Sequence, residues 1–150
     1  EGFWSEEERK MLHRIFEFGD TVVADCMIPK EKIIATEVSA SQDKFIDLVI
    51  EEEHSRIPVY KESIDNIIGI IYARELLHLW GNKQLIIISD IIHPAYFVSE
   101  SKKVNELLRE FQKMRIHIAI VIDEKRKTRG LVTLENLIDD IVGEIEQEKV

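Results

Sequence analysis

Apolar residues recur at intervals of three and four along three segments of the chain, which is the spacing of an amphipathic helix. The first segment begins with Ser5 and Glu8, a pair at capping-box spacing, and it ends at Gly19. The second follows Ser41 and the third follows Ser101, and we expect each serine to cap its helix. The apolar positions of the three predicted helices are Met11, Leu12, Ile15, Phe16 and Phe18; Phe45, Ile46, Val49 and Ile50; and Val104, Leu107, Leu108, Phe111 and Met114.

Shorter apolar runs bounded by turn-forming residues predict strands around these helices. Each half of the chain has one extended run before its helix and two runs after it, and the last two runs form a hairpin. The predicted hairpin turns are 63–66 in the first half and the charged segment 123–129 in the second. The predicted strands are 33–36, 57–60, 67–71, 96–98, 118–122 and 130–132; short turns over 21–27 and 89–93 open the halves, and helices over 72–80 and 133–145 close them.

One motif occurs twice at one spacing. Ser55-Arg56-Ile57-Pro58-Val59-Tyr60 is followed by Gly69-Ile70-Ile71-Tyr72-Ala73-Arg74-Glu75, and Ile116-His117-Ile118-Ala119-Ile120-Val121 is followed by Gly130-Leu131-Val132-Thr133-Leu134-Glu135-Asn136. The two glycines are 61 positions apart, and no gap is needed to align the halves across this stretch. A repeat of this length determines the architecture, because each copy buries a face that it cannot bury alone.

The prediction is therefore an α/β fold of the α+β kind, in which two β-α-β-β-α units stack with pseudo-twofold symmetry. We expect residues 1–20 to form a preceding helix, residues 21–81 the first unit and residues 82–150 the second. The boundary segment 82–88 lacks the Ser and Gly residues of a flexible linker, so the units should pack tightly. A groove is then expected where the two units meet.

Composition and charge narrow the classes of function. A chain of 150 residues with 45% apolar residues can bury one integrated core. A net charge of -9 argues against a nucleic-acid partner and against binding to an anionic membrane surface. The lone Cys26 cannot form an internal disulfide, which fits a reducing cytoplasm. No apolar run approaches the roughly 20 residues of a spanning helix, and the abrupt start at Glu1 suggests a piece of a longer protein.

The repeat is expected to bring apolar and polar side chains together at the seam between the units. Pro58 offers a flat apolar face for a planar ring, and Ile57 and Val132 supply apolar walls. Thr133 lies where a strand becomes a helix, and the free backbone N–H groups there favour polar or anionic oxygens. Asn136, one turn later, can form hydrogen bonds with a diol.

Ser55 and Arg56 lie at the mouth of this groove, where Arg56 can pair with a phosphate. A slot for a ring, a polar pair for a sugar and a cation for phosphate together indicate a nucleotide pocket. The same residues also admit a structural interpretation. Thr133 and Asn136 can form an ordinary helix cap, and Pro58 can mark an edge strand.

Seven stretches carry a resemblance to a known family: Phe16-Glu17-Phe18-Gly19-Asp20, Met27-Ile28-Pro29-Lys30, His54-Ser55-Arg56-Ile57-Pro58-Val59-Tyr60, Leu107-Leu108-Arg109-Glu110-Phe111-Gln112, His117-Ile118-Ala119-Ile120-Val121-Ile122-Asp123-Glu124, Gly130-Leu131-Val132-Thr133-Leu134-Glu135-Asn136 and Ile141-Val142-Gly143-Glu144-Ile145. Together they resemble a tandem pair of CBS domains (a Bateman module). More narrowly, they resemble the pair of the CorC/HlyC family, which includes magnesium and cobalt efflux proteins, hemolysin-like proteins and cyclin M transporters. The resemblance implies a cytoplasmic regulatory module that binds adenine nucleotides and commonly forms a homodimer. It also implies a parent protein with a transmembrane domain on the N-terminal side of the pair.

The resemblance places the family's ligand pocket at Ile28, at His54-Ser55-Arg56-Ile57-Pro58, and at Thr133 and Asn136, with Val132 beside them. The implied ligand is AMP or ATP, alone or with Mg²⁺. At position 136 the family has an aspartate that holds both ribose hydroxyls, and this chain has an asparagine. Because charge-assisted hydrogen bonds are roughly twice as strong as neutral ones, we expect weaker binding here.

The pseudo-equivalent pocket departs further from the family pattern. Tyr72 stands at the threonine position and Glu75 at the aspartate position, so we expect Tyr72 to narrow that cleft and leave one working site per chain. The five histidines do not pair with each other or with Cys26 at ligand spacing, so no metal centre is predicted. No residue set assembles a nucleophile, a base and an oxyanion donor, which argues against an enzyme. The remaining alternative is a structural dimerisation module whose cleft is occluded.

Overall fold

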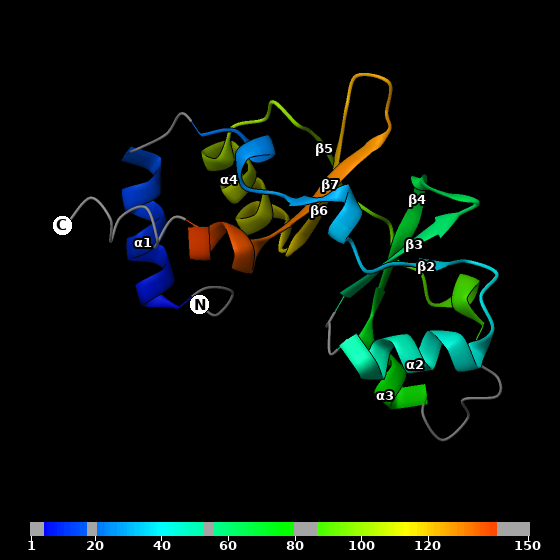
Figure 1. The fold of residues 1–150 in the computed structure, drawn as a ribbon. Coiled ribbons are helices and arrows are strands. Elements are labelled where there is room, and N and C mark those ends of the chain that lie inside the picture. Colours follow the sequence, from blue (N-terminus) through cyan, green and yellow to red (C-terminus); the bar gives the residue numbers. More distant parts are fainter. Residues whose placement is uncertain (1–4, 18–20, 53–55, 80–86, 141–150) are drawn as a thin grey trace.

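Figure 1 shows the computed structural model, which describes residues 5–17, 21–52, 56–79 and 87–140 of the 150-residue chain. The helices are α1 (Glu6–Glu17), α2 (Gln42–Glu52), α3 (Ala73–Leu79) and α4 (Val104–Met114), and a helical segment over 134–140 follows the last strand. The strands are β1 (Ile28–Pro29), β2 (Thr36–Glu37), β3 (Arg56–Lys61), β4 (Ser63–Tyr72), β5 (Phe97–Ser99), β6 (Ile118–Ile122) and β7 (Thr128–Thr133). Short 3₁₀ helices span Val23–Asp25, Lys30–Lys32 and Ile88–Asp90.

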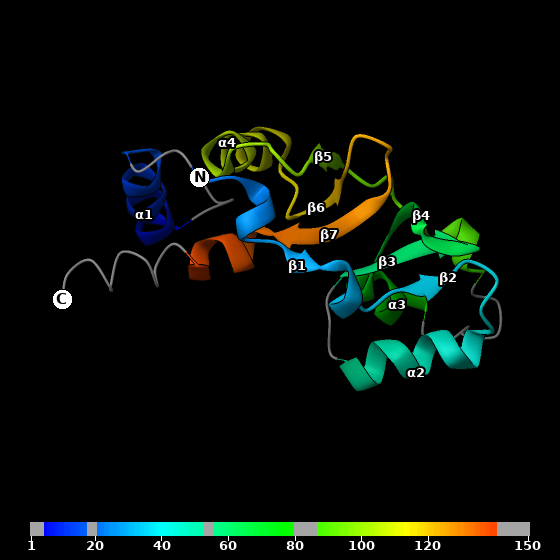
Figure 2. The same ribbon diagram turned by 45° about the horizontal axis from the view of Figure 1, so that its top comes forward.

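The strands form two sheets, ordered β2-β3-β4 and β1-β7-β6-β5. In each sheet a parallel pair (β2 with β3, β5 with β6) is connected through a helix, and an antiparallel hairpin (β3 with β4, β6 with β7) follows. Figure 2 shows α2 outside one sheet and α4 outside the other, with the two sheets between them. This confirms the predicted pair of β-α-β-β-α units behind an N-terminal helix.

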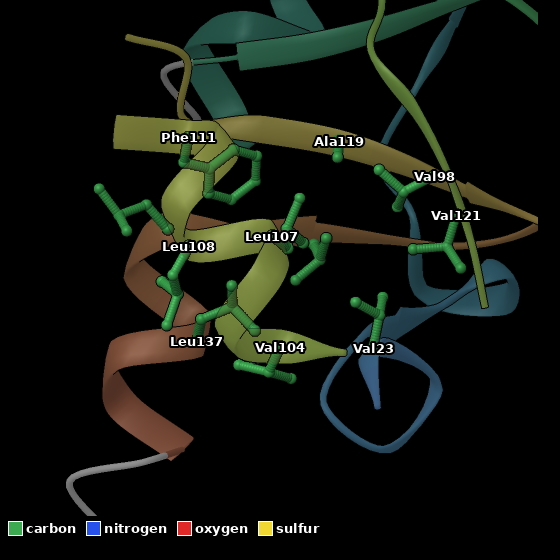
Figure 3. Close-up of a cluster of buried hydrophobic side chains, with 11 residues drawn as sticks. Val23, Val98, Val104, Leu107, Leu108, Phe111, Ala119, Val121 and Leu137 are labelled. Atoms are coloured by element: carbon green, nitrogen blue, oxygen red, sulfur yellow. The ribbon is translucent and has the colours of Figure 1, made fainter. Parts of the chain in front are cut away.

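Each unit has an outer core between its sheet and its helices, and the two sheets share a third apolar layer. Figure 3 shows the outer core of the second unit, where Phe111 and the leucines of α4 pack on β6. The shared layer contains Ile67 and Ile70 of β4 against Ile118 and Ile120 of β6. Each hairpin is thus covered by apolar side chains on both faces, by an outer core on one face and by the shared layer on the other. Burial of the shared layer stabilises the packing of the two units against each other.

The two units exchange their opening segments. Strand β1 pairs antiparallel with β7, with Ile28 opposite Leu131, so a segment from the first half completes the sheet of the second. In the pseudo-equivalent place, His93 bridges Ile70 of β4, and each backbone N–H donates to the other residue's carbonyl at 2.8 Å. A segment from the second half thus lies on the edge of the first unit's sheet.

Buried side chains follow the same exchange, and an ion pair connects the exchanged segment of the first half back to its own unit. Val23 packs fully buried in the core of the second unit, and Ile88 packs in the core of the first. Lys30 follows β1, and its Nζ lies 2.7 Å from Oδ1 of Asp65 on β4. The hydrogen bond from Lys30 lowers the pKa of the Asp65 carboxyl below its usual value. The units therefore cannot separate without opening both cores.

A glycine stands wherever an exchanged segment crosses a return strand. A Cβ on Gly130 would lie 2.5 Å from the carbonyl oxygen of Ile28 and 2.7 Å from Sδ of Met27. A Cβ on Gly69 would lie 2.6 Å from the carbonyl oxygen of His93. Neither glycine has a positive φ, so close approach of backbones is the reason for both residues.

Two of the three predicted serine caps are confirmed. The Ser5 N–H donates to Glu8 Oε1 at 2.8 Å and the Glu8 N–H donates to Ser5 Oγ at 3.2 Å, which is a capping box. Ser41 Oγ accepts from the Lys44 N–H at 3.3 Å. The predicted cap at Ser101 is wrong, because α4 begins at Val104.

The carbonyl of Thr21 takes the place of the missing cap on α4. It accepts the hydrogen bond of the Val104 N–H at 2.8 Å, so a free donor at the helix start is satisfied by the exchanged opening segment. Thr21 is distant from Val104 in the sequence, so no local sequence motif predicts this hydrogen bond.

The predicted turn at 63–66 is also wrong, because β4 begins at Ser63 and the chain reverses at Glu62 with a φ of 70°. In the second hairpin, β7 begins at Thr128, so the turn is shorter than predicted. Two positions assigned to apolar helix faces are exposed, Ile50 by 57% and Met114 by 48%. The predicted ends of the first helix at Gly19 and of the last helix at 145 lie outside the described residues.

Replacement of Gly130 by alanine should weaken the attachment of β1, because the new methyl group would overlap the Ile28 carbonyl. We expect a loss of about 1–3 kcal/mol in the free energy of unfolding, measured by chemical denaturation. Arg129→Ala, at the exposed neighbouring position of the same strand, is the control and should change stability by less than about 0.5 kcal/mol. An unfolding midpoint for Gly130→Ala equal to that of the wild type would contradict the packing argument.

Candidate functional site

Thr133 and Asn136 form a reciprocal cap where β7 ends and the helical segment 134–140 begins. The Asn136 N–H donates to Thr133 Oγ1 at 3.0 Å, and the Thr133 N–H donates to Asn136 Oδ1 at 2.6 Å. The Thr133 hydroxyl also donates to Asn136 Oδ1, at 3.1 Å. Both side chains remain partly exposed, so a polar ligand can reach them. The structural interpretation of this pair as a helix cap is thus observed in this structure.

Asn136 also connects the cap to the first unit. Its Nδ2 donates to the carbonyl oxygen of Cys26 at 2.7 Å. Cys26 lies two residues before Ile28, so this bond brings the opening segment of the first unit to the start of the second unit's last helix. A carboxylate at position 136 could not donate this hydrogen bond. The asparagine thus forms a bond that an aspartate at this position could not form.

The apolar residues predicted to line the site are more enclosed than the polar ones. Ile57 and Val132 are both 0% exposed, and Val132 belongs to the outer core of the second unit. Ile28 is partly buried in the layer between the sheets, opposite Leu131. Only Ile28 among these side chains is therefore partly open to solvent.

Pro58 occupies a position where no backbone donor is needed. It pairs with Ile70 in the β3–β4 hairpin, but the N–H and the carbonyl of Ile70 both bond to His93 on the other side. Pairing of β2 with β3 begins only at Val59, so the outer edge of Pro58 has no strand beside it in the described part of the sheet. The interpretation of Pro58 as an edge-strand residue is wrong, because β3 is the middle strand of its sheet; the proline is tolerated because it precedes the stretch of β3 that pairs with β2.

Arg56 joins the two units at the mouth of the seam. Its Nη1 lies 2.8 Å from Oε1 of Glu135, which lies between Thr133 and Asn136 in the sequence. The other carboxylate oxygen of Glu135 lies 3.7 Å from Nδ1 of His117. His54 and Ser55, the other predicted residues at the mouth, lie outside the described residues.

A cavity of about 380 Å³ opens beside Arg56, and it is lined by Arg56, Tyr72, Arg74, Arg115, Ile116 and His117. Of the predicted site residues that the structure describes, only Arg56 lines it. Sequence reasoning missed Arg115-Ile116-His117, although the 61-residue offset of the repeat makes this run the counterpart of His54-Ser55-Arg56. Alignment of the halves was the signal that could have found it.

At the pseudo-equivalent of the Thr133 and Asn136 pair, three side chains contact one another. The rings of Tyr72 and His93 meet edge to face, with centroids 4.9 Å apart and planes at 63°. Nε2 of His93 lies 2.6 Å from Oε1 of Glu75. Tyr72 and Glu75 are thus engaged with the exchanged segment of the second half.

Two further observations concern the described part of the chain. No group of three His, Cys, Asp or Glu side chains there is placed to hold a metal ion. Across residues 5–17, 21–52, 56–79 and 87–140, every helix is too short or too polar to cross a bilayer.

Comparison with known proteins identifies the fold and the motifs. The CBS domain sequence pattern matches residues 23–81 and 88–143. The magnesium and cobalt efflux protein CorC of Escherichia coli K12 is 40% identical over 144 residues, which are 95% of this chain and 49% of CorC. The chain thus spans about half the length of the CorC proteins that it matches.

Solved structures agree with this assignment. The CBS domain of a bacterial CNNM/CorC family Mg²⁺ transporter in complex with ATP is 40% identical, with a TM-score of 0.81, covering 91% of this chain and 98% of that one. A CBS-domain pair from Klebsiella pneumoniae with bound AMP is 27% identical, with a TM-score of 0.74, covering 82% and 99%. The chain therefore belongs to the CBS-domain family, as a tandem CBS pair of the CNNM/CorC type.

Proposed function

We propose that this CBS pair is a regulatory module that binds an adenine nucleotide, AMP or ATP, at the seam beside Thr133 and Asn136. The observation that carries the proposal is the hydrogen bond from Asn136 to the Cys26 carbonyl, because it joins the polar pair to the segment that contains Ile28. The related CBS pairs solved with ATP and with AMP support the choice of ligand. No catalytic step is proposed for the module.

Each proposed role follows from the chemistry of the side chain. The Thr133 hydroxyl and the Asn136 amide would bind the ribose, exchanging their mutual hydrogen bond for bonds to the sugar. Ile28 would lie against the base, with Ile57, Pro58 and Val132 behind it. Arg56 would pair with phosphate through guanidinium donors that Glu135 does not use. His54 and Ser55 complete the proposed set.

We infer a wider role from the relatives. In the parent protein, nucleotide binding at this module would regulate transport of Mg²⁺ or Co²⁺ by a membrane domain on its N-terminal side. The module itself would lie in the cytoplasm and act as a homodimer, and Mg²⁺ could accompany ATP. The match to CorC proteins supports this inference.

A purely structural dimerisation module is the second candidate. Ile57 and Val132 are fully enclosed, and the polar atoms of Thr133 and Asn136 already satisfy one another. Calorimetric titration with AMP, ADP and ATP, with and without Mg²⁺, separates the two candidates. Binding of any of these nucleotides supports the sensor, and the absence of heat with all of them at several temperatures supports the structural module.

Thr133→Val should weaken nucleotide binding about tenfold to a hundredfold, because the hydroxyl is lost at nearly constant volume. The measurement is a calorimetric titration with AMP at a temperature where circular dichroism shows the variant folded. Thr128→Val makes the same change at a 2%-exposed position of the same strand and should leave the affinity unchanged. Equal affinities for Thr133→Val and the wild type would remove Thr133 from the site.

Asn136→Asp should change affinity and stability in opposite directions. A carboxylate would bind the ribose hydroxyls more strongly, so we expect nucleotide affinity to rise about threefold to tenfold. The donor to the Cys26 carbonyl would be lost, so the ligand-free protein should lose about 1–2 kcal/mol of unfolding free energy.

Asn66→Asp is the matched control for this prediction. It makes the same chemical change in an exposed residue whose Nδ2 donates to the Lys61 carbonyl at 3.2 Å, away from the seam. Nucleotide affinity should not rise in the control. A rise of the same size in both variants would show that net charge, and not the ribose contact, is responsible.

A further inference from the structure

The segment that carries Ile28 is anchored at both ends, and the two anchors attach it to different units. At one end the Cys26 carbonyl accepts the hydrogen bond of Asn136 Nδ2 at 2.7 Å, which holds the segment to the second unit. At the other end Lys30 Nζ lies 2.7 Å from Oδ1 of Asp65, which holds the segment to β4 of the first unit. Ile28 lies midway between Cys26 and Lys30 in the sequence.

Strand pairing alone holds this segment weakly. Strand β1 contains only Ile28 and Pro29, which pair with Leu131 and Gly130 of β7 (Figure 2). Proline has no backbone N–H, so one of the two residues has no donor for the ladder. A strand with so few ladder hydrogen bonds depends on the contacts at its ends for its position.

Asp65 is a fixed and ionised partner for Lys30. Its backbone N–H donates to Ser63 Oγ at 3.1 Å, within the hairpin of the first unit. The hydrogen bond from Lys30 has the largest effect on the pKa of the Asp65 carboxyl and lowers it. The charge of Lys127 and the backbone of Thr128, both in the second unit's hairpin, lower this pKa further. The carboxyl therefore carries a negative charge at neutral pH.

The ion pair is also enclosed enough to restrict Lys30. The side chains of Lys30 and Asp65 are 35% and 31% exposed, so most of each is covered by protein. A contact between such groups loses less to solvent screening than a contact between fully exposed ones. Loss of the pair therefore frees the end of the segment that follows Ile28.

We propose that Lys30 and Asp65 are positioning residues for the nucleotide, because their ion pair fixes Ile28 in the place where it contacts the base. Neither of the two side chains touches the ligand, and both act through the backbone of β1. The inference rests on the proposed function for the identity of the ligand. The anchoring of β1 is a property of the ligand-free protein and is measured without the nucleotide.

The first experiment is a calorimetric titration with AMP of the wild type, Lys30→Met, Asp65→Ala and the double variant, at a temperature where circular dichroism shows all four folded. Lys30→Met removes a positive charge and Asp65→Ala removes a negative one. A long-range effect of charge on the AMP phosphate would therefore change the two affinities in opposite directions.

A positioning role predicts the same direction for both changes. Lys30→Met and Asp65→Ala should each bind AMP about twofold to fivefold more weakly than the wild type. The double variant should be no weaker than the weaker single variant, because either change alone already breaks the pair.

Lys30→Arg and Lys32→Met are the controls. Lys30→Arg keeps the positive charge and its hydrogen-bond donors, so it should retain the wild-type affinity. Lys32→Met removes the same charge from an exposed position in the same 3₁₀ helix, where the side chain forms no ion pair with another described residue. It should also retain the wild-type affinity.

The second experiment measures backbone hydrogen exchange in the ligand-free proteins, by mass spectrometry of peptides that cover residues 21–30. If the ion pair holds β1, these peptides should exchange about twofold to fivefold faster in Lys30→Met and Asp65→Ala than in the wild type and Lys32→Met. Peptides from α2, which packs in the outer core of the first unit, should keep the wild-type rate and so exclude a general loss of stability.

The positioning role is overturned if AMP binds the wild type and the affinities of Lys30→Met and Asp65→Ala move in opposite directions or equal that of Lys32→Met. If AMP does not bind the wild type, the proposed function fails and the exchange experiment decides alone. Faster exchange in both variants would then still support the pair as the anchor of β1, and unchanged exchange would overturn it.

Discussion

The close crossing of two backbone segments over Gly69 and Gly130 is the constraint on which the rest of the structure depends. At each crossing the space for a Cβ is already taken by a carbonyl oxygen of the other half. Because these segments belong to opposite halves, each unit's sheet and core are completed by the other unit. The same exchanged segment places the Cys26 carbonyl beside the Asn136 amide. The seam between the units is therefore formed by the exchange of segments, and not by two separate units that dock through their surfaces.

One architecture, used twice, has produced two different clefts. In one cleft a threonine and an asparagine form a cap beside an isoleucine, and in the other a tyrosine and a glutamate engage a histidine. Both places lie where an exchanged segment meets the end of a return strand, and the side chains there differ. This separation of scaffold from chemistry explains why a repeat can keep its fold while its two sites diverge.

The repeat period and the apolar spacing were enough to predict the units, the hairpins and most helix positions, because those features follow from local sequence. The prediction failed where a distant backbone group replaces a local one: the Thr21 carbonyl caps α4 in place of Ser101. Thr133 and Asn136 could be predicted from the sequence, because the cap that they form joins residues only three positions apart. Arg115 could have been found only by aligning the two halves, and Arg74 not at all, since exposed arginines are usually solvated and only the tertiary fold brings Arg74 to the cavity.

Arg56 and Glu135 link the two clefts physically. Arg56 lines the cationic cavity, and its partner Glu135 lies between the two residues of the cap at the seam. An anion bound to Arg56 would compete with Glu135 for the guanidinium group, and a ligand that moved the start of the last helix would change the contact between Glu135 and Arg56. Linkage requires any such coupling to be reciprocal: if an anion changes nucleotide affinity by some factor, the nucleotide changes anion affinity by the same factor. Since no element intervenes between the two groups, the coupling would act through a single ion pair of 2.8 Å.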